Sequence, residues 1–186
     1  MSIQKPKMIL FDYGHTLLYE IGHNAEKGNK AIYQYIKSNP KNISFQEFNK
    51  IVNSTFKKIN VCGNGIDICE KNFLRLVCGY MNIELSVSLE EAESIIWNGV
   101  SEGDIMPNAD KILDYLNKND IRSGVISNMC WSGKSLKDRL NRLLPNNKLK
   151  FVKVHYGQIF KRNKNVRLFQ RKHTAVNSGK KMETYK

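Results

Sequence analysis

The chain has 186 residues, enough for one globular domain with a small insertion. Hydrophobic residues make up 41% and charged residues 25%, which excludes wholesale disorder, collagen-like repeats and low-complexity classes. The net charge of +13 is unevenly spread, because residues 148–186 hold 12 Lys and Arg residues against one acid, Glu183. The rest of the chain is nearly neutral, and this distribution disfavours nucleic acid as a partner beyond the basic tail.

No apolar run approaches the ~20 residues needed to span a bilayer, so we expect no membrane partner. The first apolar run, Met8–Phe11, is too short for a secretory signal, and we expect a cytoplasmic protein. The four cysteines form no C-x-x-C pair, so we expect reduced thiols and not a zinc site. They are Cys62, Cys69, Cys78 and Cys130.

The first predicted element is a strand over Met8–Phe11, an unbroken apolar run between Lys7 and Asp12. Asp12 then lies at the carboxyl end of this strand. In open parallel sheets, ligands bind at that edge. The position of Asp12 therefore makes it the first candidate site residue.

Four amphipathic helices are predicted next, within residues 18–98 and with no strand between them. The first covers about 24–38 and the third about 66–82. The second and fourth each begin at a capping box, in which a Ser is followed three residues later by a Glu. The two boxes are Ser44 with Glu47 and Ser88 with Glu91. We interpret the four helices as a bundle inserted into the chain.

An α/β pattern resumes after residue 98. A helix capped by Asn108 precedes a strand at 121–127, and a leucine-rich helix precedes a weaker strand at 149–154. This order predicts an α/β fold, a Rossmann-like parallel sheet with crossover helices that is interrupted once by the helical insertion. Beyond residue 155, few apolar residues recur at either period, and no structure is predicted there.

Two segments resemble motifs of the haloacid dehalogenase superfamily. Residues 9–17, ILFDYGHTL, resemble its first motif, an apolar strand followed by D-x-D-x-T. Residues 124–128, GVISN, resemble its second motif, an apolar strand that ends in Ser or Thr. The 115 residues from Asp12 to Ser127 are similar to the spacing in the subgroup with a helical cap after the first motif.

The resemblance covers about residues 6–157 and implies a division of the chain. Residues 1–17 and 99–157 would form the haloacid dehalogenase-like core. Residues 18–98 would form a four-helix cap that closes over the site and selects the substrate. Residues 158–186 would be a basic tail.

The resemblance also implies roles for individual residues. Asp12 would be the nucleophile, which attacks phosphorus or a halogen-bearing carbon and forms a covalent aspartyl intermediate. Thr16 would orient the loop, and Ser127 with Asn128 would bind the transferred group. The Asp12 carboxylate and the main-chain carbonyl of Gly14 would hold Mg²⁺ together with an acid from the fourth motif.

Two further positions belong to this implied site. Lys161 would balance the charge of the aspartyl intermediate, with Lys164 as the alternative. Gly14 stands where the family has its second Asp, the general acid, whose loss typically costs roughly 10²–10⁴-fold in rate. His15, next to it, is a candidate substitute, although a plain loop histidine is the preferred interpretation.

The family's fourth motif, G-D-x-x-x-D, is absent, since Glu183 is the only acid after Asp138. The metal site is then incomplete by the family pattern. The change of composition near residue 148 is what a truncated or frameshifted reading frame would leave. The strand that leads to the fourth motif would also be missing, which would leave one edge of the Met8–Phe11 strand unpaired and favour self-association.

Three functional hypotheses stay open. The first is a phosphatase-type hydrolase that acts on a small phosphorylated metabolite and is impaired by the missing motif. The second is a 2-haloacid dehalogenase-like enzyme, which does not need the acid lost at Gly14. The third is a non-catalytic binding protein of the same fold.

Overall fold

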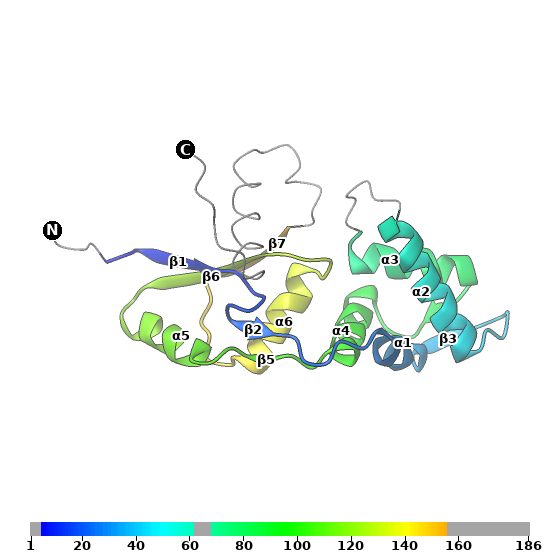
Figure 1. The fold of residues 1–186 in the computed structure, drawn as a ribbon, viewed down its shortest axis with the longest axis horizontal. Helices are drawn as coiled ribbons and strands as arrows, with labels where there is room; N and C mark the ends of the chain where they lie inside the picture. Colours follow the sequence, from blue (N-terminus) through cyan, green and yellow to red (C-terminus); the bar gives the residue numbers. More distant parts are fainter. Residues whose placement is uncertain (1–4, 62–67, 156–186) are drawn as a thin grey trace, which may run out of the picture.

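The computed structural model describes residues 5–61 and 68–155, which form a mixed α/β fold (Figure 1). Three strands pair in a parallel sheet, as predicted, and their order across the sheet is β1-β6-β7. They are β1 (Met8–Phe11), β6 (Arg122–Asn128) and β7 (Phe151–His155). This architecture is compatible with a Rossmann-like α/β fold.

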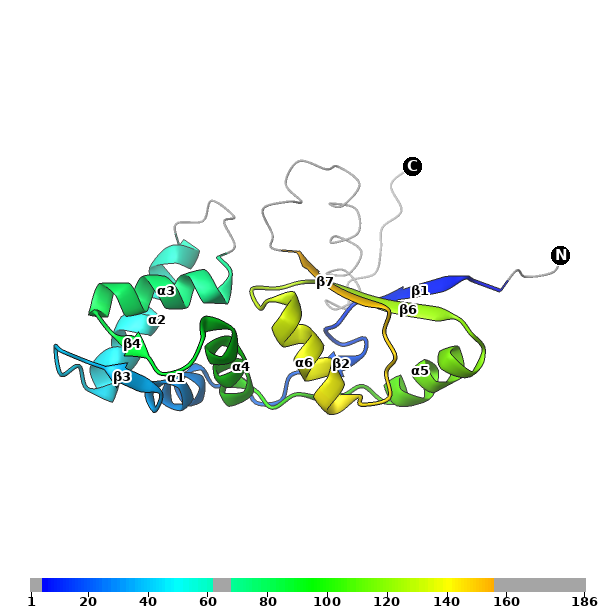
Figure 2. The same ribbon diagram turned by 180° about the vertical axis from the view of Figure 1, so that it is seen from behind.

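Two helices cover the same face of this sheet, α5 (Ala109–Lys118) and α6 (Gly133–Leu143) (Figures 1 and 2). The chain steps across the sheet in one direction, from β1 to β6 to β7, and right-handed crossovers then place both helices on one side. Alternate strand residues point toward them and form the core of this part. The core includes Val125, Leu113, Leu136 and Leu140, with Val152 packed against them.

The opposite face of the sheet carries a row of three aligned positions. Leu10 pairs with Gly124, which pairs with Phe151. The Phe151 ring lies over Gly124, so a Cβ added to this glycine would come within 2.8 Å of the ring. Leu10 is 52% exposed and Phe151 38%, so two large apolar side chains on this face remain accessible to solvent.

Four helices pack around a second core, and we call them the helical unit (Figure 2). They are α1 (Ala25–Tyr33), α2 (Phe45–Val61), α3 (Glu70–Met81) and α4 (Leu89–Val100). Two chain segments connect this unit to the sheet, and they pair through the antiparallel strands β2 (Leu18–Tyr19) and β5 (Asp104–Ile105). The Ser101 hydroxyl joins the same segments, since it bonds both the amide and the carbonyl of Ile21 at 2.9 Å.

The prediction of four helices without a strand between them is wrong. Helix α1 ends at Tyr33, and β3 (Ile36–Ser38) lies between α1 and α2. It pairs antiparallel with β4 (Glu84–Leu85), which lies between α3 and α4. Ile36 fits the apolar spacing of a helix, but its pairing with Leu85, distant in sequence, determines the local structure.

The predicted caps have different outcomes. The capping box of Ser88 and Glu91 is confirmed, because each residue's side chain accepts a hydrogen bond from the other's backbone amide. The Ser44 hydroxyl accepts from the amide of Glu47 at 3.3 Å. Asn108 occupies the N-cap position of α5 but adopts a left-handed conformation with φ 66°, and its side chain makes no capping hydrogen bond. Asn108 is therefore the N-cap residue, as predicted, but the prediction that its side chain caps the helix is wrong.

Within residues 5–61 and 68–155, no helix is both long enough and apolar enough to cross a membrane.

We predict that the outer edge of β1 mediates self-association. Among the described strands, β1 pairs only with β6, and unpaired N–H and C=O groups can template pairing with another chain. Sedimentation velocity should show a weight-average mass that rises with protein concentration. Leu10→Lys should reduce this rise because it places a charge on β1. Tyr80→Lys, at another exposed position, is the matched control and should not. A chain that stays monomeric at all concentrations would contradict the prediction.

Candidate functional site

The structure brings Asp12, Ser127 and Asn128 to the same edge of the sheet. Strand β1 ends at Phe11, which pairs with Val125, and Ser127 and Asn128 are the last residues of β6. The carboxyl ends of parallel strands meet at one edge, and ligands bind there in open α/β sheets. Ser127 is buried, Asp12 is half-buried and Asn128 is exposed. The edge therefore presents a carboxylate, a hydroxyl and an amide together.

A compact turn carries the first-motif residues, and we call residues 12–18 the Asp12 loop. The Tyr13 carbonyl accepts hydrogen bonds from the amides of Thr16, Leu17 and Leu18 at 3.1–3.3 Å. The Tyr13 amide donates to Asp12 Oδ1 at 2.7 Å. The loop therefore turns around the backbone of Tyr13, with the Asp12 carboxylate at its start.

Steric crowding does not explain why residue 14 is a glycine. A Cβ at this position would meet nothing within 4 Å, so the loop has room for a side chain. The left-handed residue of the turn is its neighbour His15, with φ 55°, whose amide bonds the Leu18 carbonyl at 2.8 Å. A Cβ at position 14 would thus meet no steric obstacle.

A cluster of charged and aromatic side chains lies beside the Asp12 loop, with Arg139, Tyr13 and Trp97 buried and Glu20 partly open to solvent. No motif in the sequence predicts this cluster. The Glu20 carboxylate accepts from Tyr13 Oη at 2.6 Å, from Trp97 Nε1 at 3.2 Å and from Arg139 Nη2 at 3.0 Å. The Arg139 guanidinium also lies over the Trp97 ring, 4.5 Å from its centroid. Trp97 in turn stacks on Trp131, which follows β6, with ring centroids 5.0 Å apart. The signal in the sequence was a charged residue, Arg139, on the leucine stripe of its helix.

A second buried acid joins the helical unit to the sheet part. Glu93 of α4 is 0% exposed and accepts from the Ser132 amide at 2.8 Å, from Ser135 Oγ at 2.7 Å and from Ser132 Oγ. Ser132 is the N-cap of α6, so Glu93 places a negative charge at that helix N-terminus. This acid holds the segment that follows Ser127 and Asn128 against α4.

Glu70, the first residue of α3, lies near Glu93. Its amide donates to the Cys130 carbonyl at 2.9 Å, a further contact with the segment after β6. Burial and the negative charge of Glu93 raise the pKa of Glu70 to about 7. The folded protein therefore favours the protonated form of this carboxyl group below about pH 7.

We expect the free energy of unfolding to depend on pH through Glu70. Because its pKa is raised in the folded state from the ordinary 4.5 to about 7, folding takes up a proton between these values. This contribution is complete below pH 4.5 and is lost as the pH rises through 7. Glu70→Gln should remove it and stabilise the protein at pH 8 relative to wild type, by on the order of 2–3 kcal/mol. Urea unfolding from pH 4.5 to 8 measures it, and parallel curves for the two proteins would contradict it.

The described residues do not complete a magnesium site. The two expected ligands, the Asp12 carboxylate and the Gly14 carbonyl, lie in one loop. No group of three or more His, Cys, Asp or Glu side chains that could hold a metal ion occurs in the described part of the chain. Lys161 and its alternative Lys164 lie outside the described residues. We therefore derive no reaction step through a metal ion.

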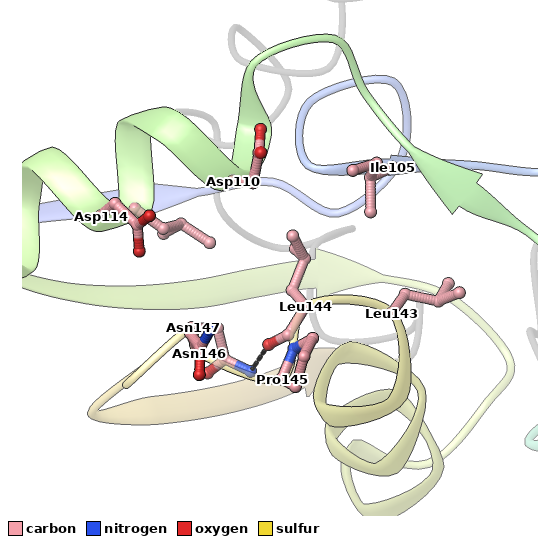
Figure 3. A pocket seen from close by; sticks show the side chains of 9 residues that line it. Ile105, Asp110, Asp114, Leu143, Leu144, Pro145, Asn146 and Asn147 are labelled. Carbon is pink, nitrogen blue, oxygen red and sulfur yellow. Dashed lines mark hydrogen bonds between the residues drawn. The ribbon is translucent and has the colours of Figure 1, made fainter.

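A small pocket lies away from these residues, between α5 and the end of α6 (Figure 3). Its volume is about 170 Å³, and Asp110, Asp114 and Leu144 are among the residues that line it. Asn147 closes one side, with its side-chain amide donating to the Leu144 carbonyl at 2.7 Å. No candidate site residue lines this pocket, so it is separate from the edge that carries Asp12.

No model of a protein family matches the chain, and no curated protein does so either.

Proposed function

We propose that this chain is a haloacid dehalogenase-like hydrolase in which Asp12 is the nucleophile and α1–α4 serve as the cap. One observation carries the proposal. The parallel pairing of β1 with β6 brings Asp12 to the sheet edge at which Ser127 and Asn128 end the neighbouring strand. A carboxylate that can act as a nucleophile at the end of one strand, beside hydrogen-bonding groups at the end of the next, is compatible with covalent aspartyl transfer.

The substrate we propose first is a small phosphorylated metabolite. A carboxylate oxygen of Asp12 attacks phosphorus, the bond from phosphorus to the ester oxygen breaks, and Ser127 and Asn128 bind the transferred group. The leaving oxygen needs a proton, and Gly14 has no acid to supply it. We therefore expect slow turnover, with the least penalty for aryl phosphates, whose leaving groups depart without protonation.

The glycine at position 14 favours one further candidate, a 2-haloacid. Asp12 would then attack the carbon that bears the halogen, the carbon–halogen bond would break, and the halide would leave without a proton. Water would open the resulting ester and return the carboxylate. Neither step requires an acid at position 14.

A single turnover in H₂¹⁸O, with protein in excess over substrate, tests the proposal and separates the two substrates. Water opens an Asp12 ester at the carbonyl carbon, so 2-haloacid turnover should place ¹⁸O in Asp12, which peptide mass spectrometry detects. An aspartyl phosphate opens at phosphorus, so ¹⁸O should appear in the released phosphate. Asp12→Asn should abolish both signals.

Two controls sharpen this test. Position 14 has space for a Cβ, and Gly14→Asp would restore an acid there. The change supplies no further carboxylate from the missing fourth motif, so we expect it not to restore magnesium-dependent phosphatase activity. Asp12→Asn that keeps full turnover would refute the proposal. Absence of turnover on both substrate classes would instead favour a binding protein of this fold.

A further inference from the structure

We propose that Glu20 is a positioning residue for the Asp12 loop and that it acts through the phenol of Tyr13. The inference deepens the proposed function, on which it rests, because it says what holds the nucleophile in place. Glu20 lies just after β2, in one of the two connections between the sheet part and the helical unit.

Tyr13 organises the Asp12 loop through its backbone. Its amide bonds the Asp12 carboxylate, and its carbonyl accepts the amides of Thr16, Leu17 and Leu18. Every one of these hydrogen bonds involves the Tyr13 backbone. A rotation of Tyr13 would therefore alter the turn and the orientation of the Asp12 carboxylate together.

Glu20 in turn holds the Tyr13 side chain. The ring is buried, packs 5.7 Å from the Trp97 ring, and ends in a 2.6 Å hydrogen bond from Oη to Glu20 Oε1. Burial and the contact with Glu20 raise the pKa of the Tyr13 phenol, which therefore stays protonated and remains a donor. This hydrogen bond connects a charged residue outside the Asp12 loop to the residue around which the loop turns.

Glu20 is itself anchored by contacts with α6 and the helical unit. Arg139, whose side chain is 2% exposed, pairs with Glu20 at 3.0 Å and donates to the Ser101 carbonyl at 2.6 Å. Gly103, with φ 68°, leaves the space that the guanidinium fills, since a Cβ there would lie 2.4 Å from Nη2. Trp97 of α4 donates to the same carboxylate. Glu20 therefore ties the Asp12 loop to α6 and to the helical unit at one point.

Amide hydrogen exchange tests this role without any need for turnover. Tyr13→Phe removes only the hydroxyl, and it should speed exchange of the Leu17 and Leu18 amides about tenfold, equivalent to about 1.4 kcal/mol of lost local stability. Glu20→Leu should do the same. Glu20→Gln keeps an oxygen that accepts from Tyr13, so it should retain most of the protection.

Tyr33→Phe is the matched control, because Tyr33 Oη also donates one partly buried hydrogen bond, to the Ile43 carbonyl at 2.7 Å, but within the helical unit. It should leave exchange in the Asp12 loop unchanged. Combining Tyr13→Phe with Glu20→Leu should add nothing to Glu20→Leu alone, since both changes remove the same contact. Should Glu20→Leu not fold, Tyr13→Phe and Glu20→Gln still decide the matter.

Unchanged exchange in Tyr13→Phe, or an equal effect of Tyr33→Phe, would overturn the positioning role. The single-turnover assay provides the link to function. There, Tyr13→Phe should lower the rate of the Asp12-dependent ¹⁸O signal and Tyr33→Phe should not. Faster loop exchange with no ¹⁸O signal in the wild-type chain would refute the proposed function and leave the loop contact established.

Discussion

Gly28→Ala is expected to lower the free energy of unfolding by about 2–3 kcal/mol, because helices α1 and α4 approach too closely for a methyl group at this position. A Cβ on Gly28 would lie 2.5 Å from Val100 Cγ2 and 2.9 Å from the carbonyl oxygen of Ile96. A side chain can rotate away, but a backbone oxygen can move only with its helix. Gly99 forms the other side of the contact, with its own Cβ position 2.9 Å from the Cα of Gly28.

Gly79→Ala is the matched control. Gly79 also lies within a helix, α3, but it is exposed and a Cβ there would meet nothing within 4 Å. Alanine restricts the unfolded chain and favours the helix, so this change should stabilise the protein by about 0.5–1 kcal/mol. Urea unfolding measures both variants, and the two changes should have opposite signs. An unchanged stability in Gly28→Ala would mean that the helices can separate at little cost.

Replacing Glu93 with leucine is expected to cost about 3 kcal/mol or more. The carboxylate is fully buried and accepts hydrogen bonds from the amide and hydroxyl of Ser132 and from the hydroxyl of Ser135. Leucine fills similar space but removes the acceptor of these donors. The Ser132 hydroxyl keeps a contact with the Ser135 hydroxyl at 3.2 Å, whereas the Ser132 amide loses its partner, and each unsatisfied buried group costs roughly 1–3 kcal/mol. Glu93→Gln keeps one acceptor oxygen and should cost less.

Glu90→Gln is the control on the same helix. Its carboxylate pairs with Lys71 at 2.9 Å at the surface, where ion pairs contribute little, so stability should barely change.

Glu93→Gln has a second expected consequence, because it removes the charge that helps to raise the pKa of Glu70. The pH dependence assigned to Glu70 should therefore weaken in this variant. Equal stability of Glu93→Leu and wild type would show that Ser132 and Ser135 find other partners.

Much of the sheet part could be predicted from the sequence, because the relevant signals are local. The apolar runs that became β1 and β6 are short and bounded by polar residues, and the helices between strands show clear apolar faces. Once parallel strands are assumed, Asp12 and Ser127 must meet at one edge, since both follow or end a strand at its carboxyl end. The structure has this arrangement.

The polar contacts between distant segments could not be predicted in this way. Arg139 and Glu93 each sit on an apolar helix stripe, a local sign that a charged side chain is buried. Their partners are remote, however, since Glu20 lies 119 residues from Arg139 and Ser132 lies 39 residues from Glu93. Spacing along one helix carries no information about which group on another element will pair with the charged side chain.

The short strands β3 and β4 show the same limit. Each has two or three residues, too few for an alternating pattern to emerge, and Ile36 also suits the apolar face of a preceding helix. Its strand conformation comes from hydrogen bonding to a segment almost fifty residues away, which becomes a neighbour only when the four helices pack. Local periodicity thus specifies elements that bury a whole face of their own, whereas elements and charges that are stabilised only by a distant partner depend on the tertiary structure.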